Sequence, residues 1–177
     1  QNLTDAKVVD LRASDGKVQC DISNDILHIA CVERYGKTGG IGKAFVTGFG
    51  LKEGAFAESI AHDAHNIIAI GTNTKDMALA INRVIEMKGG IAIAKGGAVL
   101  NELSLPVGGL ITDELTAYEL SSKMRELNNA VKDRLGCKVH APFMHLSFLA
   151  LTTSPKWKIT DKGLIDVNSF EILPPVI

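Results

Sequence analysis

The sequence has few cysteines, few aromatic residues and no excess of charge of either sign. Its 177 residues include three cysteines, Cys20, Cys31 and Cys137, and none of them forms a Cys-x-x-Cys spacing. This predicts neither a disulfide framework nor a zinc knuckle, and it favours a reducing, cytoplasmic location. Lys and Arg number 19 and Asp and Glu number 20, which gives a formal net charge of −1. Without a basic excess, binding to nucleic acid or to an anionic membrane surface is not expected.

Long apolar runs are also absent. No stretch approaches the roughly 18–20 apolar residues that a membrane span needs, and no charged-then-apolar leader opens the chain. The length and the 46% share of hydrophobic residues suit one globular domain over residues 1–177. Because the chain starts at Gln1 rather than Met, we expect it to be a piece of a longer protein.

Apolar and β-branched residues predict a block of strands in the first 70 residues. After these residues, the apolar positions recur at the spacing of a helix. A turn at 14–16 and a hairpin with a flexible tip at 36–40 connect some of the strands. The expected strands are 7–10, 18–20, 26–34, 43–49, 55–62, 66–71, 91–94, 98–105 and 163–170.

Two long helices and one short helix are expected. Asn73 is a good N-cap for the first, which ends near Gly89. Thr112 can cap the second, over residues 113–135, before Gly136. Pro142 suits the first turn of the third, although the apolar run 143–151 can also be a buried strand. These elements predict an α+β fold with mixed, largely antiparallel sheets packed against the helices.

The densest polar cluster is the segment 61–66, Ala-His-Asp-Ala-His-Asn. It lies where one expected strand ends and the next begins, and the ends of strands often carry binding residues. His62, Asp63 and His65 can ligate a metal or relay a proton. The alternative is a structural turn in which Asp63 and Asn66 hydrogen-bond to backbone groups.

Other polar residues give weaker signals. Glu33 and Arg34 can form a surface ion pair or line a polar site beside the glycine-rich loop 36–42. That loop lacks the Gly-Lys-Ser/Thr spacing of a P-loop and precedes a strand, so a flexible hairpin tip is the favoured interpretation. His145 is expected to be a hydrogen-bonded core residue. Cys137 is expected to be a small buried residue.

Several runs of residues, in the same order, resemble the bacterial and archaeal adenine deaminases. The segment 59–66, Ser-Ile-Ala-His-Asp-Ala-His-Asn, is similar to a His-Asp-Ser-His-Asn segment of that family, and the similarity extends over nearly the whole chain from Val8. The runs that carry it are 31–39, 46–55, 59–66, 71–73, 142–151 and 163–167.

The resemblance covers only the carboxy-terminal domain of those enzymes. They belong to the amidohydrolase superfamily, whose metal ligands lie on a preceding (β/α)₈ barrel that opens with a His-x-His pair. No His-x-His occurs here, and a TIM barrel needs about 200 residues or more, so none is expected in this chain. The resemblance thus implies no cofactor in this chain, and manganese or iron in the barrel of the parent enzyme.

For the whole enzyme, the resemblance implies hydrolysis of adenine to hypoxanthine and ammonia, a reaction at a cyclic amidine C–N bond used in purine salvage and adenine catabolism. The implied partners are the barrel domain of the same protein and further copies in a homo-oligomer. This chain alone is expected to be inactive.

By the same resemblance, His62, Asp63 and His65 are expected to line the active site or to support the groups that do. Glu33, Arg34 and Asn66 are the expected substrate-binding residues, and no metal ligand is assigned. The sequence departs from the family at Ala64, where the family has a serine. The segment 152–154, Thr-Thr-Ser, departs from a more apolar run.

Two alternatives stay open. The domain can be an assembly module, in which the polar turn is structural and the family activity resides elsewhere. It can also be a stand-alone domain for a small ligand or a metal, with His62, Asp63 and His65 joined by one more histidine.

Overall fold

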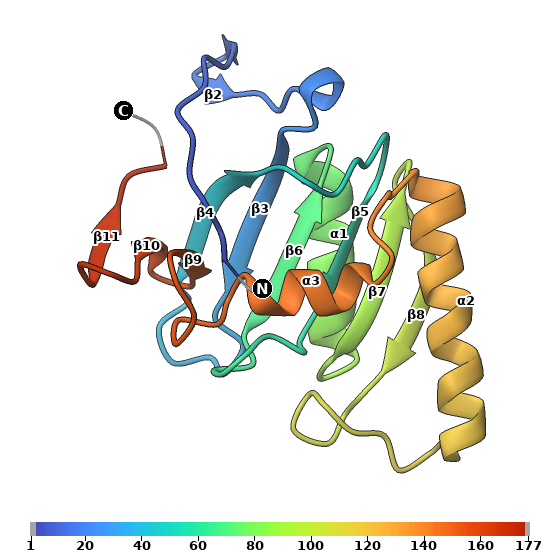
Figure 1. Ribbon diagram of the computed structural model, residues 1–177. Coiled ribbons are helices and arrows are strands. Elements are labelled where there is room, and N and C mark those ends of the chain that lie inside the picture. Colours follow the sequence, from blue (N-terminus) through green and yellow to red (C-terminus); the bar gives the residue numbers. More distant parts are fainter. Residues whose placement is uncertain (1–2, 176–177) are drawn as a thin grey trace.

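The computed structural model describes residues 3–175, whose largest element is a six-stranded sheet (Figure 1). Its strands lie in the order β4-β3-β6-β5-β7-β8, and every neighbouring pair is antiparallel. This confirms the expected α+β class, and residues 3–175 contain no closed barrel. The strands are β3 Leu27–Val32, β4 Ile41–Val46, β5 Ala55–Glu58, β6 Ile67–Gly71, β7 Gly90–Lys95 and β8 Ala98–Ser104.

The central strands are buried on both faces, which explains why they read as continuous apolar runs. In β7, isoleucine alternates with alanine, and the two residue types point to opposite faces of the sheet. One face of the sheet is lined mostly by alanines and the other mostly by larger residues. The alanines of the small face are Ala30, Ala55, Ala57, Ala69, Ala92 and Ala94.

Helix α1, Thr74–Glu86, packs on the small face (Figure 1). Asn73 caps it as expected, with its side-chain oxygen accepting from the Asp76 backbone N–H at 2.8 Å. The Asp76 carboxylate accepts in turn from the backbone N–H groups of Gly96 and Gly97, in the turn between β7 and β8. Desolvation alone would raise the pKa of Asp76, but the hydrogen bond from the Asn73 side-chain amide, together with those from Gly97 and Gly96, lowers it. The glycine bonds also fix the start of α1 to the sheet.

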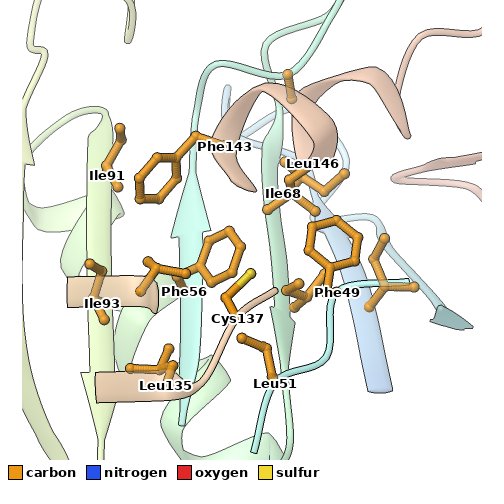
Figure 2. Packing of buried hydrophobic residues seen from close by; sticks show 14 of the residues in the cluster. Phe49, Leu51, Phe56, Ile68, Ile91, Ile93, Leu135, Cys137, Phe143 and Leu146 are labelled. Carbon is orange, nitrogen blue, oxygen red and sulfur yellow. The ribbon is translucent and has the colours of Figure 1, made fainter. Parts of the chain in front are cut away.

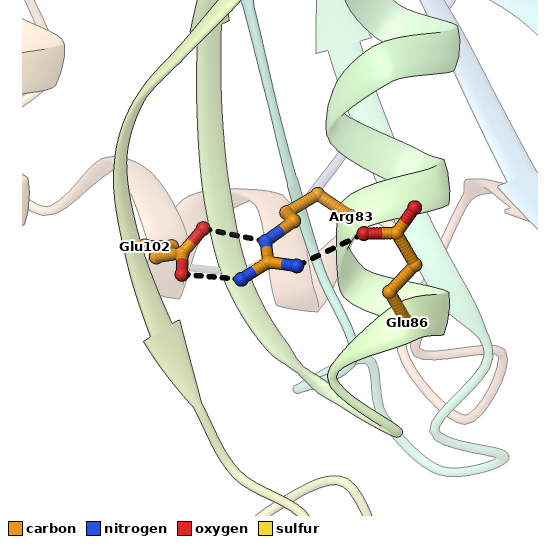
Figure 3. Close-up of polar contacts among 3 residues, drawn as sticks. All are labelled: Arg83, Glu86 and Glu102. Carbon is orange, nitrogen blue, oxygen red and sulfur yellow. Dashed lines mark hydrogen bonds and ion pairs between the residues drawn. The ribbon is translucent and has the colours of Figure 1, made fainter.

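Arg83 joins the other end of α1 to β8 (Figure 3). Its guanidinium makes two hydrogen bonds of 2.6 Å to the Glu102 carboxylate and one of 2.9 Å to Glu86. Arg83 lowers the pKa of Glu102. Because these side chains are partly exposed, their bonds orient the helix more than they stabilise it.

Helices α2, Ala117–Leu135, and α3, Pro142–Phe148, cover the large face. Figure 2 shows the cluster that forms there, in which the rings of Phe56 and Phe143 meet edge to face at 5.3 Å. Cys137 is buried in this cluster, as expected. His145 is exposed on α3, so its expected place in the core was wrong. The helix turns His145 outward while Phe143 and Leu146 take the buried positions.

Helix α2 begins later than the expected cap at Thr112. Its N-cap is Thr116, whose hydroxyl accepts from the Glu119 N–H, while the Glu119 carboxylate accepts from the Thr116 N–H at 2.8 Å. This reciprocal pair satisfies two backbone donors, which a cap at Thr112 would not do. The helix ends at Gly136, as expected, with φ of 77°.

Two smaller sheets complete the described fold. Strands β9 Trp157–Thr160, β10 Gly163–Asp166 and β11 Glu171–Leu173 form an antiparallel sheet beside β4, and β9 was not expected from the sequence. Strands β1 Ala13–Ser14 and β2 Lys17–Val18 flank the expected turn, but the expected strand at 7–10 is absent. No helix within residues 3–175 is both long and apolar enough to span a membrane.

Candidate functional site

The polar cluster of the sequence lies at one end of the large sheet. Residues 59–66 connect β5 to β6, two antiparallel neighbours. Strand β3 lies on the other side of β6, and Val32 pairs with Ile67. Glu33 and Arg34, which follow β3, are therefore placed beside the His-Asp-Ala-His-Asn turn, as the sequence interpretation required.

A cavity of about 340 Å³ opens at this turn. This volume falls within the range typical of small-ligand sites, roughly 300–1,000 Å³. Four separate parts of the chain form its walls: the turn, β3, the segment after α3, and the β9–β10 hairpin. The lining residues are Cys31, Ala61, His62, Asp63, Ala64, Asn66, Ala150, Thr152, Ile159, Thr160 and Asp161.

His62 and Asp63 are the uncommitted polar residues of the turn. The His62 ring packs against Phe148 of α3 with 5.6 Å between ring centroids, and its side chain is half-buried. Asp63 is exposed. Neither side chain has a hydrogen bond to any other residue within the described range 3–175. Both side chains line the cavity, so both are available to a ligand.

His65 points differently, because its backbone has a φ of 52° and its N–H donates to the Ala61 carbonyl at 2.7 Å. Its ring lies edge to face with His62 at 5.8 Å, and its Nδ1 is buried without a hydrogen bond in residues 3–175. Burial lowers the pKa of His65, and the neighbouring His62 and Arg34 lower it further. The ring is therefore neutral at pH 7. His65 does not line the cavity.

Asn66 is buried and fully engaged. Its side-chain oxygen accepts from the Arg34 backbone N–H at 3.3 Å, and its amide nitrogen donates to the Asp161 carboxylate at 3.1 Å. These two bonds connect the segment after β3 with the β9–β10 hairpin.

The Arg34 side chain, which the sequence interpretation assigned to substrate, donates to backbone carbonyls in this structure. Its guanidinium donates to the carbonyls of His65 at 2.8 Å, Gly108 at 2.6 Å and Lys88 at 3.4 Å. It also stacks over the Tyr35 ring at 4.7 Å, and the Tyr35 hydroxyl donates to the Ala64 carbonyl. Arg34 therefore ties the histidine turn to two neighbouring loops.

Glu33 is committed to the glycine-rich loop. Its carboxylate accepts from four backbone N–H groups, those of Tyr35, Lys37, Thr38 and Gly39, at 2.6–3.4 Å. Desolvation alone would raise the pKa of Glu33, but these N–H donors outweigh it and lower the pKa. The backbone N–H groups of the loop are thus occupied by the Glu33 carboxylate, so they do not form a free phosphate site.

Asp161, which sequence reasoning missed, enters the site from the tip of the β9–β10 hairpin. The hairpin lies so close to β4 that a Cβ added at Gly42 would overlap the Thr160 carbonyl oxygen. A Cβ at Gly40 would lie 3.0 Å from the Asp161 carbonyl oxygen. The signal in the sequence was Gly42 near the start of β4, with Gly40 just before it, since glycine in a strand is typical of a close backbone approach.

Cys31 lies at the apolar side of the cavity, beside Ala61 and Ile159. Burial raises the pKa of its thiol to about 12, and the nearby Asp161 charge contributes. The thiol is therefore protonated at pH 7 and is a poor nucleophile.

The turn does not fit a metal centre. Within residues 3–175, no three His, Cys, Asp or Glu side chains come together as a metal-binding group. A catalytic metal takes at least three protein ligands in most sites. The cavity therefore provides polar contacts for a ligand rather than a coordination sphere.

The family match and three similar relatives agree on one protein family, and each covers nearly the whole chain. Residues 1–171 match the family described as the adenine deaminase C-terminal domain. A relative from Carboxydothermus hydrogenoformans, named adenine deaminase 1, is 67% identical over 99% of this chain. Adenine deaminases from Desulfatibacillum aliphaticivorans and Desulforamulus reducens are 46% and 45% identical over 98% and 94% of it. The matched region is 28–30% of the length of these relatives. The chain therefore belongs to the adenine deaminase C-terminal domain family.

Proposed function

We propose that this domain forms one wall of the active site of an adenine deaminase, and that His62 and Asp63 contact the substrate there. The reaction is hydrolytic: water replaces the 6-amino group of adenine, which gives hypoxanthine and ammonia. Three relatives that match 94–99% of this chain are named adenine deaminases, and this supports the assignment.

The observation that carries the proposal is the contrast between committed and free side chains. Glu33, Arg34 and Asn66 are used within the protein. His62 and Asp63 face a cavity and have no hydrogen bond within residues 3–175. In a turn that served only the fold, a half-buried ring such as that of His62 would be expected to have a hydrogen-bond partner within the protein.

His62 and Asp63 suit the proton transfers of this reaction. Cleavage of the C–N bond needs a proton on the departing amine, and the attacking water must lose one. Imidazole and carboxylate side chains are the usual groups for both transfers. We assign His62 and Asp63 to holding or moving a proton near the 6-amino group, while neutral His65 supports the His62 ring from behind.

The rest of the catalytic machinery is assigned to the larger part of the protein. This chain corresponds to less than a third of its relatives, so an amidohydrolase barrel in the remaining part is a plausible partner domain. The manganese or iron of the parent enzyme would be held by that barrel, because this turn does not fit a metal. This chain alone is expected to be inactive.

Exposed apolar residues between β8 and α2 support a docking role for that segment. They lie in the loop that projects from the sheet in Figure 1, and Arg34 binds the Gly108 carbonyl at its base. Such side chains on one loop often mark an interface. The same segment supports a second candidate function, the assembly of a homo-oligomer. The residues are Val107, Leu110, Ile111, Leu115 and, in the first turn of α2, Tyr118.

The test uses the full-length protein that contains this chain. His62→Ala and Asp63→Asn should each lower kcat/KM for adenine by about 10²- to 10⁴-fold, the usual range for loss of a general acid or base. His140→Ala and Asp133→Asn are matched controls, because both residues are exposed, and neither lines the cavity nor lies in the segment between β8 and α2. These controls should keep kcat/KM within about twofold of the unmodified protein.

Two results would decide against the proposal. The first is an unchanged kcat/KM in folded His62→Ala and Asp63→Asn proteins. The second is adenine deamination at enzymatic rates by the 177-residue chain alone with manganese added, since the catalytic centre would then lie within it. A variant that loses assembly but keeps kcat would support the second candidate function.

A further inference from the structure

We infer that Asp161 contacts the substrate in this cavity, where one carboxylate oxygen accepts a hydrogen bond from a ring N–H of the purine base. The inference rests on the proposed function and adds a residue that lies far from the histidine turn in the sequence. Asp161 lines the same cavity as His62 and Asp63, and it reaches that cavity from a different sheet.

A chain of hydrogen bonds fixes the direction of the Asp161 carboxylate. The Arg34 backbone N–H donates to the Asn66 side-chain oxygen, which leaves the Asn66 amide nitrogen to face Asp161. That nitrogen donates to Asp161 Oδ1 at 3.1 Å. Asp161 Oδ2 has no hydrogen bond to any residue in the range 3–175. One oxygen is therefore anchored by Asn66, and the other, which lies beside Gly40, has no hydrogen-bond partner among the described residues.

The backbone beneath Asp161 is also fixed. The hairpin tip packs directly on β4, where Gly42 leaves room for the Thr160 carbonyl and Gly40 for Asp161 itself. The Thr160 hydroxyl accepts from the Lys162 N–H at 3.2 Å, which closes the tip. A side chain held in this way is preorganised for binding, so less entropy is lost when a ligand binds.

The charge of the cavity indicates which ligand groups it can accept. Its described lining includes the carboxylates of Asp63 and Asp161, and it includes no lysine or arginine. A phosphate would meet two like charges there and no cation, so a nucleotide is disfavoured. A neutral base that presents N–H donors complements the same carboxylates.

Adenine has two kinds of N–H donor. The 6-amino group is the one that leaves, and the ring N–H lies on the five-membered ring. If His62 and Asp63 serve the amino group, the ring N–H is the donor left for Asp161. A charged acceptor placed there should favour binding of the free base over a base substituted at that nitrogen.

The experiment is Asp161→Asn in the full-length protein. Asparagine keeps a side-chain oxygen for the Asn66 amide, but it places an NH₂ group where Oδ2 stood. KM for adenine should rise about 10- to 100-fold, as expected for loss of a hydrogen bond to a charged group, while kcat changes by less than about threefold. The inhibition constant of 9-methyladenine, which lacks the ring N–H, should be unchanged. Asp166→Asn is the matched control, since Asp166 lies in the same sheet outside the cavity and, among residues 3–175, its carboxylate accepts only from the Asn168 N–H.

The outcomes separate this inference from the proposed function. If Asp161→Asn leaves KM unchanged while His62→Ala lowers kcat/KM, the Asp161 assignment alone is wrong. If Asp161→Asn weakens 9-methyladenine as much as adenine, the contact is not to the ring N–H, and the inference is overturned. If neither His62→Ala nor Asp161→Asn has an effect in a folded protein, both assignments fail. A retained thermal unfolding midpoint confirms that each variant is folded.

Discussion

The amide of Asn66 donates to the carboxylate of Asp161 at 3.1 Å, although 95 positions separate the two residues in the chain. Asn66 ends the turn between β5 and β6, and Asp161 sits at the tip of the β9–β10 hairpin. Their bond therefore joins the large sheet to the small one at the wall of the cavity. The site is a product of how two sheets pack, and Gly42 of β4 and the preceding Gly40 allow that packing.

Gly42→Ala should displace the hairpin. The added Cβ would overlap the Thr160 carbonyl oxygen, and the nearby obstacles are all backbone atoms, so the contact cannot be relieved by a rotamer change. We expect a loss of about 3 kcal/mol in the free energy of unfolding, as for overpacking of a tight site. Urea denaturation measures the loss, and hydrogen exchange should show it first in residues 157–166.

Gly39→Ala is the control for that variant. A Cβ at Gly39 meets nothing within 4 Å, but its φ of 66° is unfavourable for alanine. The free energy of unfolding should therefore fall only by the strain of placing alanine at this positive φ, about 1 kcal/mol. Equal losses for Gly39→Ala and Gly42→Ala would show that the close approach of the hairpin is unimportant.

Arg34→Lys should loosen the histidine turn without removing a positive charge. The guanidinium reaches the His65 and Gly108 carbonyls together, whereas an ammonium group lacks the planar fork that holds both. We expect the free energy of unfolding to fall by about 1–2 kcal/mol, and hydrogen exchange to become faster in residues 61–66 and 106–111. Arg125→Lys is the control, because Arg125 is exposed and, within the described part of the chain, its guanidinium donates only to the Ser121 hydroxyl. Uniformly faster exchange across the fold would contradict a local role.

Thr116→Ala tests the corrected start of α2. It removes the hydroxyl half of the reciprocal pair with Glu119, and loss of such a cap costs about 1 kcal/mol. Thr112→Ala, at the cap expected from the sequence, should cost less, because Thr112 accepts only one exposed bond from the Glu114 N–H. Thermal unfolding of both variants ranks the two losses, and the reverse order would place the cap at Thr112.

Local signals in the sequence predicted the elements whose causes are local. The cap at Asn73 and the stop at Gly136 follow from one side chain and one backbone conformation. The sequence also placed His62 and Asp63 at a strand end, because the apolar runs on either side of them were clear. Such features depend on neighbours a few positions away, and a single sequence contains them.

The roles of the polar residues depend on distant partners, and the sequence did not reveal these. Arg34 is committed because Gly108 lies 74 positions away in the chain but next to it in the fold. Glu33 is occupied by a loop that resembled a flexible tip. Asp161 entered the site through a strand, β9, that had not been expected. Residue types predicted that this region was polar, but only tertiary packing determined which side chains stayed free.

Glu58 provides a prediction about pH, because its carboxyl lies inside the core. It is fully buried on β5, between Ile68 and Ile91 of the neighbouring strands, and neither oxygen has a hydrogen bond within residues 3–175. Burial raises its pKa well above the ordinary value of 4.5. Below that value the carboxyl is protonated in both the folded and the unfolded chain. As the pH rises, only the unfolded chain releases this proton, so the free energy of unfolding falls by up to about 1.4 kcal/mol per pH unit until the raised pKa is passed.

Glu58→Met should therefore stabilise the protein at pH 7. Methionine has a similar length and no polar atom that needs a hydrogen bond, so we expect the free energy of unfolding to rise by about 2 kcal/mol. The gain should shrink towards pH 4, where the Glu58 carboxyl is neutral in both states. Urea denaturation at pH 4, 5.5 and 7 measures the trend, and Glu114→Gln, an exposed site, should leave the trend of the unmodified protein in place. A Glu58→Met protein that is less stable at pH 7, or that keeps the same pH dependence, would mean that this carboxyl has a compensating partner in the folded protein. Such a partner would supply the hydrogen bonds or charge that offset its burial.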